Sequence, residues 1–134
     1  MKVAASLMVL ACGLLGFHAD AGETTSFSER VAIAKRIEAQ KETADYFKTG
    51  MYPAIGPALA SAMRDCMSRP GASTEKFTVV ADVSQNGEFI HIAHEPKTNT
   101  AACLAGAMAS FRAPPPPTCD CGDLPIVIDM SITP

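Results

Sequence analysis

The spacing of apolar residues predicts two helices in the first half of the chain. Between residues 27 and 48 the apolar positions are irregular among many Lys, Arg and Glu side chains, and Ser26 with Glu29 forms a capping box at the start. We expect a charged, partly solvated helix there. A second helix is predicted from Tyr52 to about Arg69, because its apolar residues recur three or four positions apart and share one face. These residues are Ile55, Leu59, Met63 and Cys66.

Alternation with a period of two then predicts a β-hairpin between residues 76 and 95. Asn86-Gly87 is a preferred sequence for a two-residue type I′ turn, in which both central residues need positive φ. The pairs expected from this turn are Gln85 with Glu88, Val83 with Ile90, Ala81 with Ile92, and Val79 with His94. This register places most apolar residues on one face of the hairpin. The opposite face would carry Thr78, Val80, Asp82, Phe89 and His91, and we expect it to face either solvent or the first helix.

The last part of the chain predicts a third helix and a third strand. Thr98 or Thr100 can cap a helix that ends near Arg112, and the prolines at 114–117 must then continue in an extended conformation. Residues 124–132 alternate again, which indicates a strand with one buried face. A right-handed connection through the third helix gives the strand order 2-1-3, with the last strand at an edge of the sheet.

The first residues predict export. Lys2 supplies a positive charge, residues 3–17 form an almost unbroken apolar stretch, and Ala19-Asp20-Ala21 fits the small-x-small pattern that signal peptidase cleaves. We expect residues 1–21 to be a signal peptide and the mature protein to be periplasmic, because the apolar stretch is shorter than the roughly 20 residues of a membrane span. The alternatives are a retained anchor and a lipoprotein, since the sequence before Cys12 resembles a lipobox.

Size and charge favour a small interaction domain. Residues 22–134 suit one core, and we divide them into a charged N-terminal helix, residues 22–51, and a domain, residues 52–134. The formal net charge is −3, so no nucleic-acid partner is expected. There is no Gly-rich phosphate loop, no Gly-x-Ser-x-Gly motif and no catalytic acidic pair. We therefore expect neither an enzyme nor a cofactor, and we identify no small-molecule substrate.

The histidines do not indicate a metal site. His91 and His94 are three positions apart on a strand and point to opposite faces, so they cannot bind one ion together. In the expected register His91 lies across from Asp82, which indicates a cross-strand polar pair. We therefore expect no metal.

The cysteine positions predict at least one disulfide, because oxidation is the default in an exported chain. The hairpin strands are antiparallel, so Cys66 and Cys103 fall at the same end of the sheet, where a bridge would stabilise the fold by about 3–4 kcal/mol. Cys119 and Cys121 fall at the opposite end. Three alternatives stay open for these two: a staple within their own loop, a labile redox-active pair, or a bridge from one of them to Cys66 or Cys103.

Several short motifs occur in the order found in a known domain. They are Tyr52-Pro53, the strand-Asn86-Gly87-strand unit, the Cys66 and Cys103 pair, and Phe111 followed by the proline run. Together they resemble the C-terminal domain of TonB, and in particular its cysteine-bearing AgmX/PglI-type relatives, over roughly residues 52–133. The resemblance implies an α+β fold with helices packed on one face of a three-stranded antiparallel sheet, and a role in periplasmic protein–protein contact. We expect no retained anchor and see no long Pro-rich spacer, so the energy transduction of TonB is not expected.

The expected partner is another envelope or exported protein. It would bind at the free edge of the last strand, or at the face that carries Phe89 and His91. The candidate interaction residues are Phe89, His91, Val127, Asp129 and Ser131. One alternative is a periplasmic immunity or inhibitor protein that blocks an exported toxin. Another is a thiol-redox accessory that uses Cys119 and Cys121, and the oligomeric state is not predicted.

Overall fold

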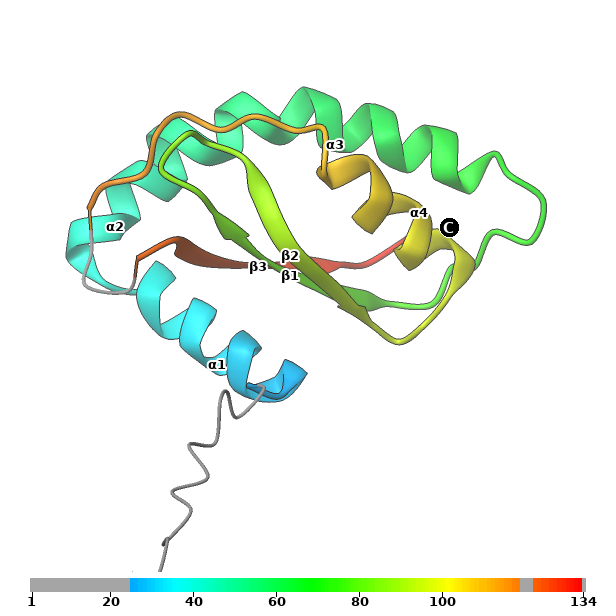
Figure 1. The fold of residues 1–134 in the computed structure, drawn as a ribbon. Coiled ribbons are helices and arrows are strands. Elements are labelled where there is room, and N and C mark those ends of the chain that lie inside the picture. The colour runs from blue at the N-terminus through cyan, green and yellow to red at the C-terminus, as the bar shows by residue number, and fades with distance from the viewer. Residues whose placement is uncertain (1–24, 119–121, 134) are drawn as a thin grey trace, which may run out of the picture.

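The computed structural model describes residues 25–118 and 122–133 (Figure 1). The helical segments and strands, in chain order, are α1 (Phe27–Glu38), α2 (Lys41–Asp45), the π-helical η1 (Tyr46–Met51), α3 (Tyr52–Met67), β1 (Phe77–Val83), β2 (Phe89–Glu95), α4 (Asn99–Met108) and β3 (Leu124–Met130). The strands form a three-stranded antiparallel sheet in the order β2-β1-β3, as expected. Among these residues, none of the helices meets the length and apolarity that a bilayer span demands.

Helices cover both faces of the sheet. In Figure 1, α3 and α4 lie above the sheet and α1 lies below it. The α+β class and the packing of α3 and α4 on one face agree with the expected fold. On the other face, Ala34 of α1 packs against Val80 of β1 and Val127 of β3, and all three side chains are buried. The expectation that the helices share one face therefore holds for α3 and α4 only.

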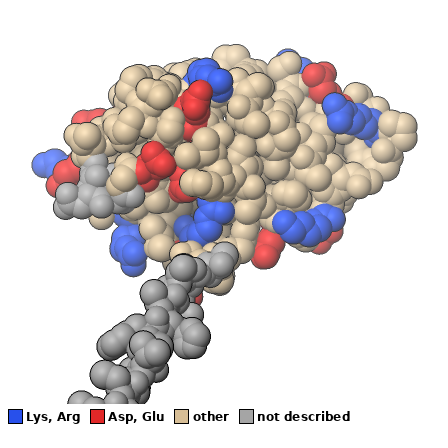
Figure 2. Space-filling view, in the orientation of Figure 1, with Lys and Arg blue, Asp and Glu red and all other residues tan. Residues whose placement is uncertain are grey.

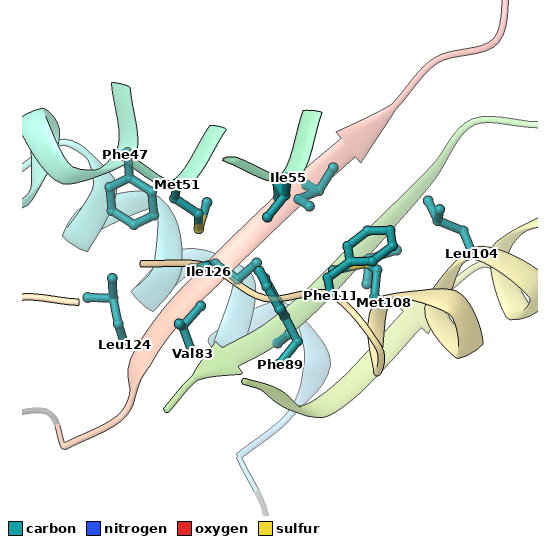
Figure 3. Packing of buried hydrophobic residues seen from close by; sticks show 14 of the residues in the cluster. Phe47, Met51, Ile55, Val83, Phe89, Leu104, Met108, Phe111, Leu124 and Ile126 are labelled. Carbon is teal, nitrogen blue, oxygen red and sulfur yellow. The ribbon is translucent and has the colours of Figure 1, made fainter. Parts of the chain in front are cut away.

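The main core fills the space between the sheet and the layer formed by η1, α3 and α4 (Figure 3). Met51 and Ile55 contribute from the helical layer, and Val83, Leu124 and Ile126 contribute from the strands. Each of these side chains has an exposed fraction of 1 % or less. The face of β1 that packs in this core is the predicted one and carries Phe77, Val79, Ala81 and Val83.

The first predicted helix is interrupted at the end of α1. Its start is as expected, because Ser26 and Glu29 form a capping box. The Thr43 hydroxyl donates a hydrogen bond to the carbonyl of Ile37, and this buried contact holds the bend between α1 and α2. Helix propensity does not reveal a bond of this kind. The prediction of a single helix over residues 27–48 is therefore wrong.

The chain before residue 52 shares the core of the chain after it. η1 runs directly into α3, so the boundary expected between residues 51 and 52 lies inside a continuous helical stretch. Phe47 and Met51 on the N-terminal side of this point are buried together with Ile55 on the other side. Residues from both segments thus build one fold.

The start of α4 distinguishes between the two expected caps. Thr98 is the cap, since its hydroxyl accepts a hydrogen bond from the N–H of Ala101 at 3.1 Å. Thr100 is buried instead and donates to the carbonyl of Ser73 at 2.9 Å. The helix ends at Met108, earlier than expected.

The hairpin does not contain the expected two-residue type I′ turn. Ser84 donates its N–H to the carbonyl of Glu88 at 2.8 Å, so the loop has three residues and ends in Gly87, whose φ is +79°. A left-handed residue at the end is typical of three-residue loops. The segment around Ala113, which packs against the turn, explains why a glycine is needed at this position. Gly87 accepts a hydrogen bond from the N–H of Ala113 at 2.9 Å, and a Cβ on Gly87 would lie only 1.9 Å from the Ala113 oxygen.

A β-bulge in β2 compensates for the longer turn. Near the turn, Val83 pairs with Phe89, one position away from the expected register. At the far end, Val79 pairs with His94 as predicted. The register changes between these pairs, where His91 has a φ of +51°, and we identify His91 as the extra residue.

Candidate functional site

Strand β3 lies at an edge of the sheet. It pairs with β1 in an unbroken register, from Leu124 opposite Val83 to Met130 opposite Phe77. On its other side it pairs with no strand in the described part of the chain. Such an edge carries backbone N–H and C=O groups to which another strand can form hydrogen bonds.

The direction of these backbone groups follows from the alternation along β1. Ser84, which follows β1, donates its N–H to the β2 side, so Asp82 also directs its backbone groups toward β2. The residues that alternate with Asp82 direct their backbone groups toward β3 instead, and Ile126 and Ile128 of β3 lie opposite two of them. Pro125, which lies opposite Asp82, fits this pattern because it has no N–H to donate to β1. Val127 and Asp129 therefore direct their N–H and C=O groups to the free edge.

The opposite edge of the sheet, formed by β2, is less accessible to a partner strand. The bulge at His91 interrupts the regular spacing of its hydrogen-bonding groups. Near the turn, Arg112 forms an isolated β-bridge with Glu88, and their side chains form an ion pair at 3.6 Å. Within residues 25–118 and 122–133, no bridge or loop hydrogen bond of this kind reaches Val127 or Asp129.

Asp129 links the edge strand to both β1 and α1. Its carboxylate accepts a hydrogen bond from the Thr78 hydroxyl at 2.7 Å and lies 3.3 Å from the ammonium group of Lys35. Both contacts stabilise the ionised carboxylate, so the pKa of Asp129 lies below its usual value, with the Thr78 hydrogen bond as the largest cause. Burial acts in the opposite direction and does not outweigh them. A negative charge therefore stands beside the free edge at neutral pH.

The predicted interaction residues divide into buried and exposed ones. The prediction that Phe89 lies on the hairpin face opposite the core is wrong, because the bulge turns its ring into the main core, where its exposed fraction is 3 %. Val127 is covered by α1 and has an exposed fraction of 7 %. The side chains of His91, Asp129 and Ser131 are exposed. An interaction at β3 would thus use the backbone of Val127 and not its side chain.

A polar cluster surrounds the bulge. Nδ1 of His91 lies 2.9 Å from Oδ2 of Asp82, so the expected cross-strand pair is present. Arg30 of α1 donates an N–H to the carbonyl of His91 at 2.6 Å and lies 3.9 Å from Asp82. The first helix was one of the two alternatives for this face of the hairpin, but no sequence pattern identified Arg30 as the residue that contacts the bulge. In the part of the chain that the structure describes, no three His, Cys, Asp or Glu side chains come together as metal ligands.

The predicted disulfide between Cys66 and Cys103 is present. It joins α3 to α4, with the two Cα atoms 5.7 Å apart. Cys66 is buried in the helical layer, and Cys103 is partly exposed. Cys119 and Cys121 lie outside the described residues, and so do Cys12 and the predicted signal peptide. The disulfide holds α3 and α4 together within the helical layer that lies opposite α1.

Charged side chains are mixed on the surface. On the face shown in Figure 2, Lys and Arg lie interspersed with Asp and Glu among uncharged residues. The described atoms of that face therefore present no large patch of one sign.

Comparison of the chain with protein-family models, with curated proteins and with solved structures finds no match. The resemblance to the TonB C-terminal domain stays a prediction from the sequence motifs. The free edge of β3 is then the structural feature from which a function follows most directly.

Proposed function

We propose that this protein is an exported, disulfide-stabilised interaction module of the bacterial envelope that binds an extended segment of another protein. The segment adds to the free edge of β3 as a further strand. The observation that carries this proposal is the outward direction of the backbone groups of Val127 and Asp129, at an edge that no described segment pairs with. The similarity of the sequence motifs to the TonB C-terminal domain supports the same class of function.

Main-chain hydrogen bonds supply the affinity in this mode of binding, and flanking side chains supply the selectivity. Val127 and Asp129 each offer one N–H and one C=O, and each hydrogen bond formed contributes about 0.5–1.5 kcal/mol net. Lys35 and Asp129 place a positive and a negative charge beside the edge. Helices on both faces keep the sheet rigid, and this reduces the entropic cost of ordering the edge on binding.

Photo-cross-linking in the native host tests the proposal. A photoreactive amino acid at Ser131, an exposed position just beyond β3, is expected to form a discrete adduct with one partner protein. Asp129→Pro removes the outward N–H and should abolish the adduct. Asp129→Ala also loses the contacts to Thr78 and Lys35 but keeps the N–H, so this matched variant should retain the adduct.

A second position controls for non-specific contact. Ala60 is exposed on α3, on the other side of the sheet from α1. An adduct that forms equally from Ala60, or that survives Asp129→Pro unchanged, would contradict β3 as the binding edge. The identity of the partner also separates an envelope adaptor from an inhibitor of an exported toxin.

A further inference from the structure

A small cavity lies between α1 and the sheet, next to the bulge. Its volume is about 200 Å³. Ile33 of α1, Val80 of β1 and Pro125 of β3 form apolar parts of its wall, and Arg30 and Asp82 contribute opposite charges. The cavity is on the face of the sheet that α1 covers, so it is distinct from the backbone edge of β3.

Arg30 and Asp82 retain hydrogen-bonding groups that the protein does not use. Nη2 of Arg30 donates to the carbonyl of His91, and Oδ2 of Asp82 faces Nδ1 of the same histidine. In residues 25–118 and 122–133, no hydrogen bond reaches Nε or Nη1 of Arg30, or Oδ1 of Asp82. Both side chains are only 22 % exposed, so a ligand that satisfies these groups gains more than it would at an open surface.

We propose that this cavity binds a small zwitterion, namely a free α-amino acid with a short aliphatic side chain. The carboxylate of the amino acid accepts hydrogen bonds from the unused N–H groups of Arg30. Its ammonium group donates to Oδ1 of Asp82. The aliphatic side chain contacts the apolar wall formed by Ile33, Val80 and Pro125.

The size of the cavity suits this class of ligand. A volume of about 200 Å³ corresponds to roughly seven water molecules at about 30 Å³ each. It lies below the 300–1,000 Å³ range of sites for drug-sized ligands, so a nucleotide is too large and an amino acid such as valine fits. The opposite charges also discriminate against simple ions, because an anion meets Asp82 and a cation meets Arg30.

Titration of the isotopically labelled full chain with L-valine, followed by amide NMR, tests the proposal. We expect saturable shifts at residues 80–82 and at Ile126, which all lie on the cavity wall. N-acetyl-L-valine lacks the ammonium group and L-valinamide lacks the carboxylate, while both keep the side chain. Each analogue should bind at least about tenfold more weakly than valine, because each loses one set of charge-assisted hydrogen bonds.

Variants of the two charged residues give an independent readout. Arg30→Gln and Asp82→Asn should each weaken valine binding at least about tenfold, whereas Arg36→Gln, the same substitution at an exposed position of α1 outside the cavity wall, should leave it unchanged. Melting temperatures separate loss of binding from loss of fold. If Arg30→Gln lowers the melting temperature by loosening α1, the isosteric variant Asp82→Asn tests whether valine binding depends on the paired charges.

Three outcomes would overturn the proposal. The first is the absence of saturable shifts with valine. The second is an affinity for N-acetyl-L-valine or L-valinamide equal to that for L-valine. The ligand would then be a simple anion, a simple cation or the terminus of a peptide. The third is valine binding that survives both charge-removing variants in folded protein.

Discussion

The rings of Phe89 and Phe111 pack edge to face in the main core, with their centroids 6.2 Å apart and their planes at 86°. Figure 3 shows the two rings side by side, one from the start of β2 and one from the segment after α4. The bulge at His91 makes this contact possible, because it reverses the alternation that would otherwise turn Phe89 to the α1 face. A local irregularity in β2 thus supplies a central core residue.

Removal of the Phe89 ring should therefore be costly. Phe89→Ala is expected to lower the free energy of unfolding by about 3–5 kcal/mol, because it leaves a cavity between the sheet and the helices. His91→Ala, which removes an exposed side chain, should cost less than about 1 kcal/mol. Urea unfolding followed by circular dichroism measures both values. Similar small losses for the two variants would show that Phe89 lies at the surface.

The close approach of Gly87 to Ala113 predicts opposite effects for two glycine substitutions. Gly87→Ala should lower the free energy of unfolding by about 2 kcal/mol or more, because φ is positive and the added Cβ meets the Ala113 carbonyl. Gly106→Ala places a methyl group in open space on α4 and should raise stability by about 0.5–1 kcal/mol. Thermal and urea unfolding measure whether each substitution lowers or raises the free energy of unfolding. A neutral Gly87→Ala variant would contradict the three-residue loop.

The disulfide between α3 and α4 should contribute substantially to stability. The double variant Cys66→Ser with Cys103→Ser is expected to lose about 3–4 kcal/mol, since the bridge closes a loop between residues 37 positions apart. Urea unfolding with and without reductant measures this loss. A loss below about 1 kcal/mol would mean that the bridge does not constrain the unfolded chain as expected.

Asp129 should give the stability of the protein a dependence on acidic pH. Its folded pKa lies below the ordinary value of 3.8, so its contribution is present above the unfolded pKa and is lost as the pH falls through the folded pKa. Thr78→Val and Lys35→Gln should each move the pKa of Asp129 upward, toward the ordinary value, because each removes a contact that stabilises the carboxylate. Carboxyl-carbon NMR titration measures both shifts. An unchanged pKa in either variant would contradict the corresponding contact of Asp129.

Local sequence patterns were sufficient for features that depend on neighbouring residues or on topology. The capping box of Ser26 and Glu29 needs only the first turn of α1. The period-two alternation of β1 identified its buried face, and the antiparallel hairpin placed Cys66 near Cys103. Each of these features follows from short-range geometry or from the order of elements.

The errors have two sources, a contact between segments far apart in the chain and a side-chain hydrogen bond over six positions. The turn is set by the hydrogen bond from Ala113 to Gly87, and the bend after α1 by Thr43. The longer turn and the bulge at His91 shift the register in opposite senses, so the pair of Val79 with His94 was predicted correctly from a wrong turn. The contact of Gly87 with Ala113 depends on how the segment after α4 packs against the hairpin, so no local pattern of the hairpin could reveal it. The bond from Thr43 to Ile37 is local, but neither helix propensity nor apolar spacing indicates it.

Hydrogen exchange of the backbone amides of β3 tests the central claim most directly. The N–H groups of Ile126 and Ile128 point to β1, whereas those of Val127 and Asp129 point to the free edge. In the isolated protein we predict that the two outward amides exchange at least about tenfold faster than the two inward ones. Equal protection of all four amides would mean that the edge is already covered, and would contradict β3 as the site at which a partner strand binds.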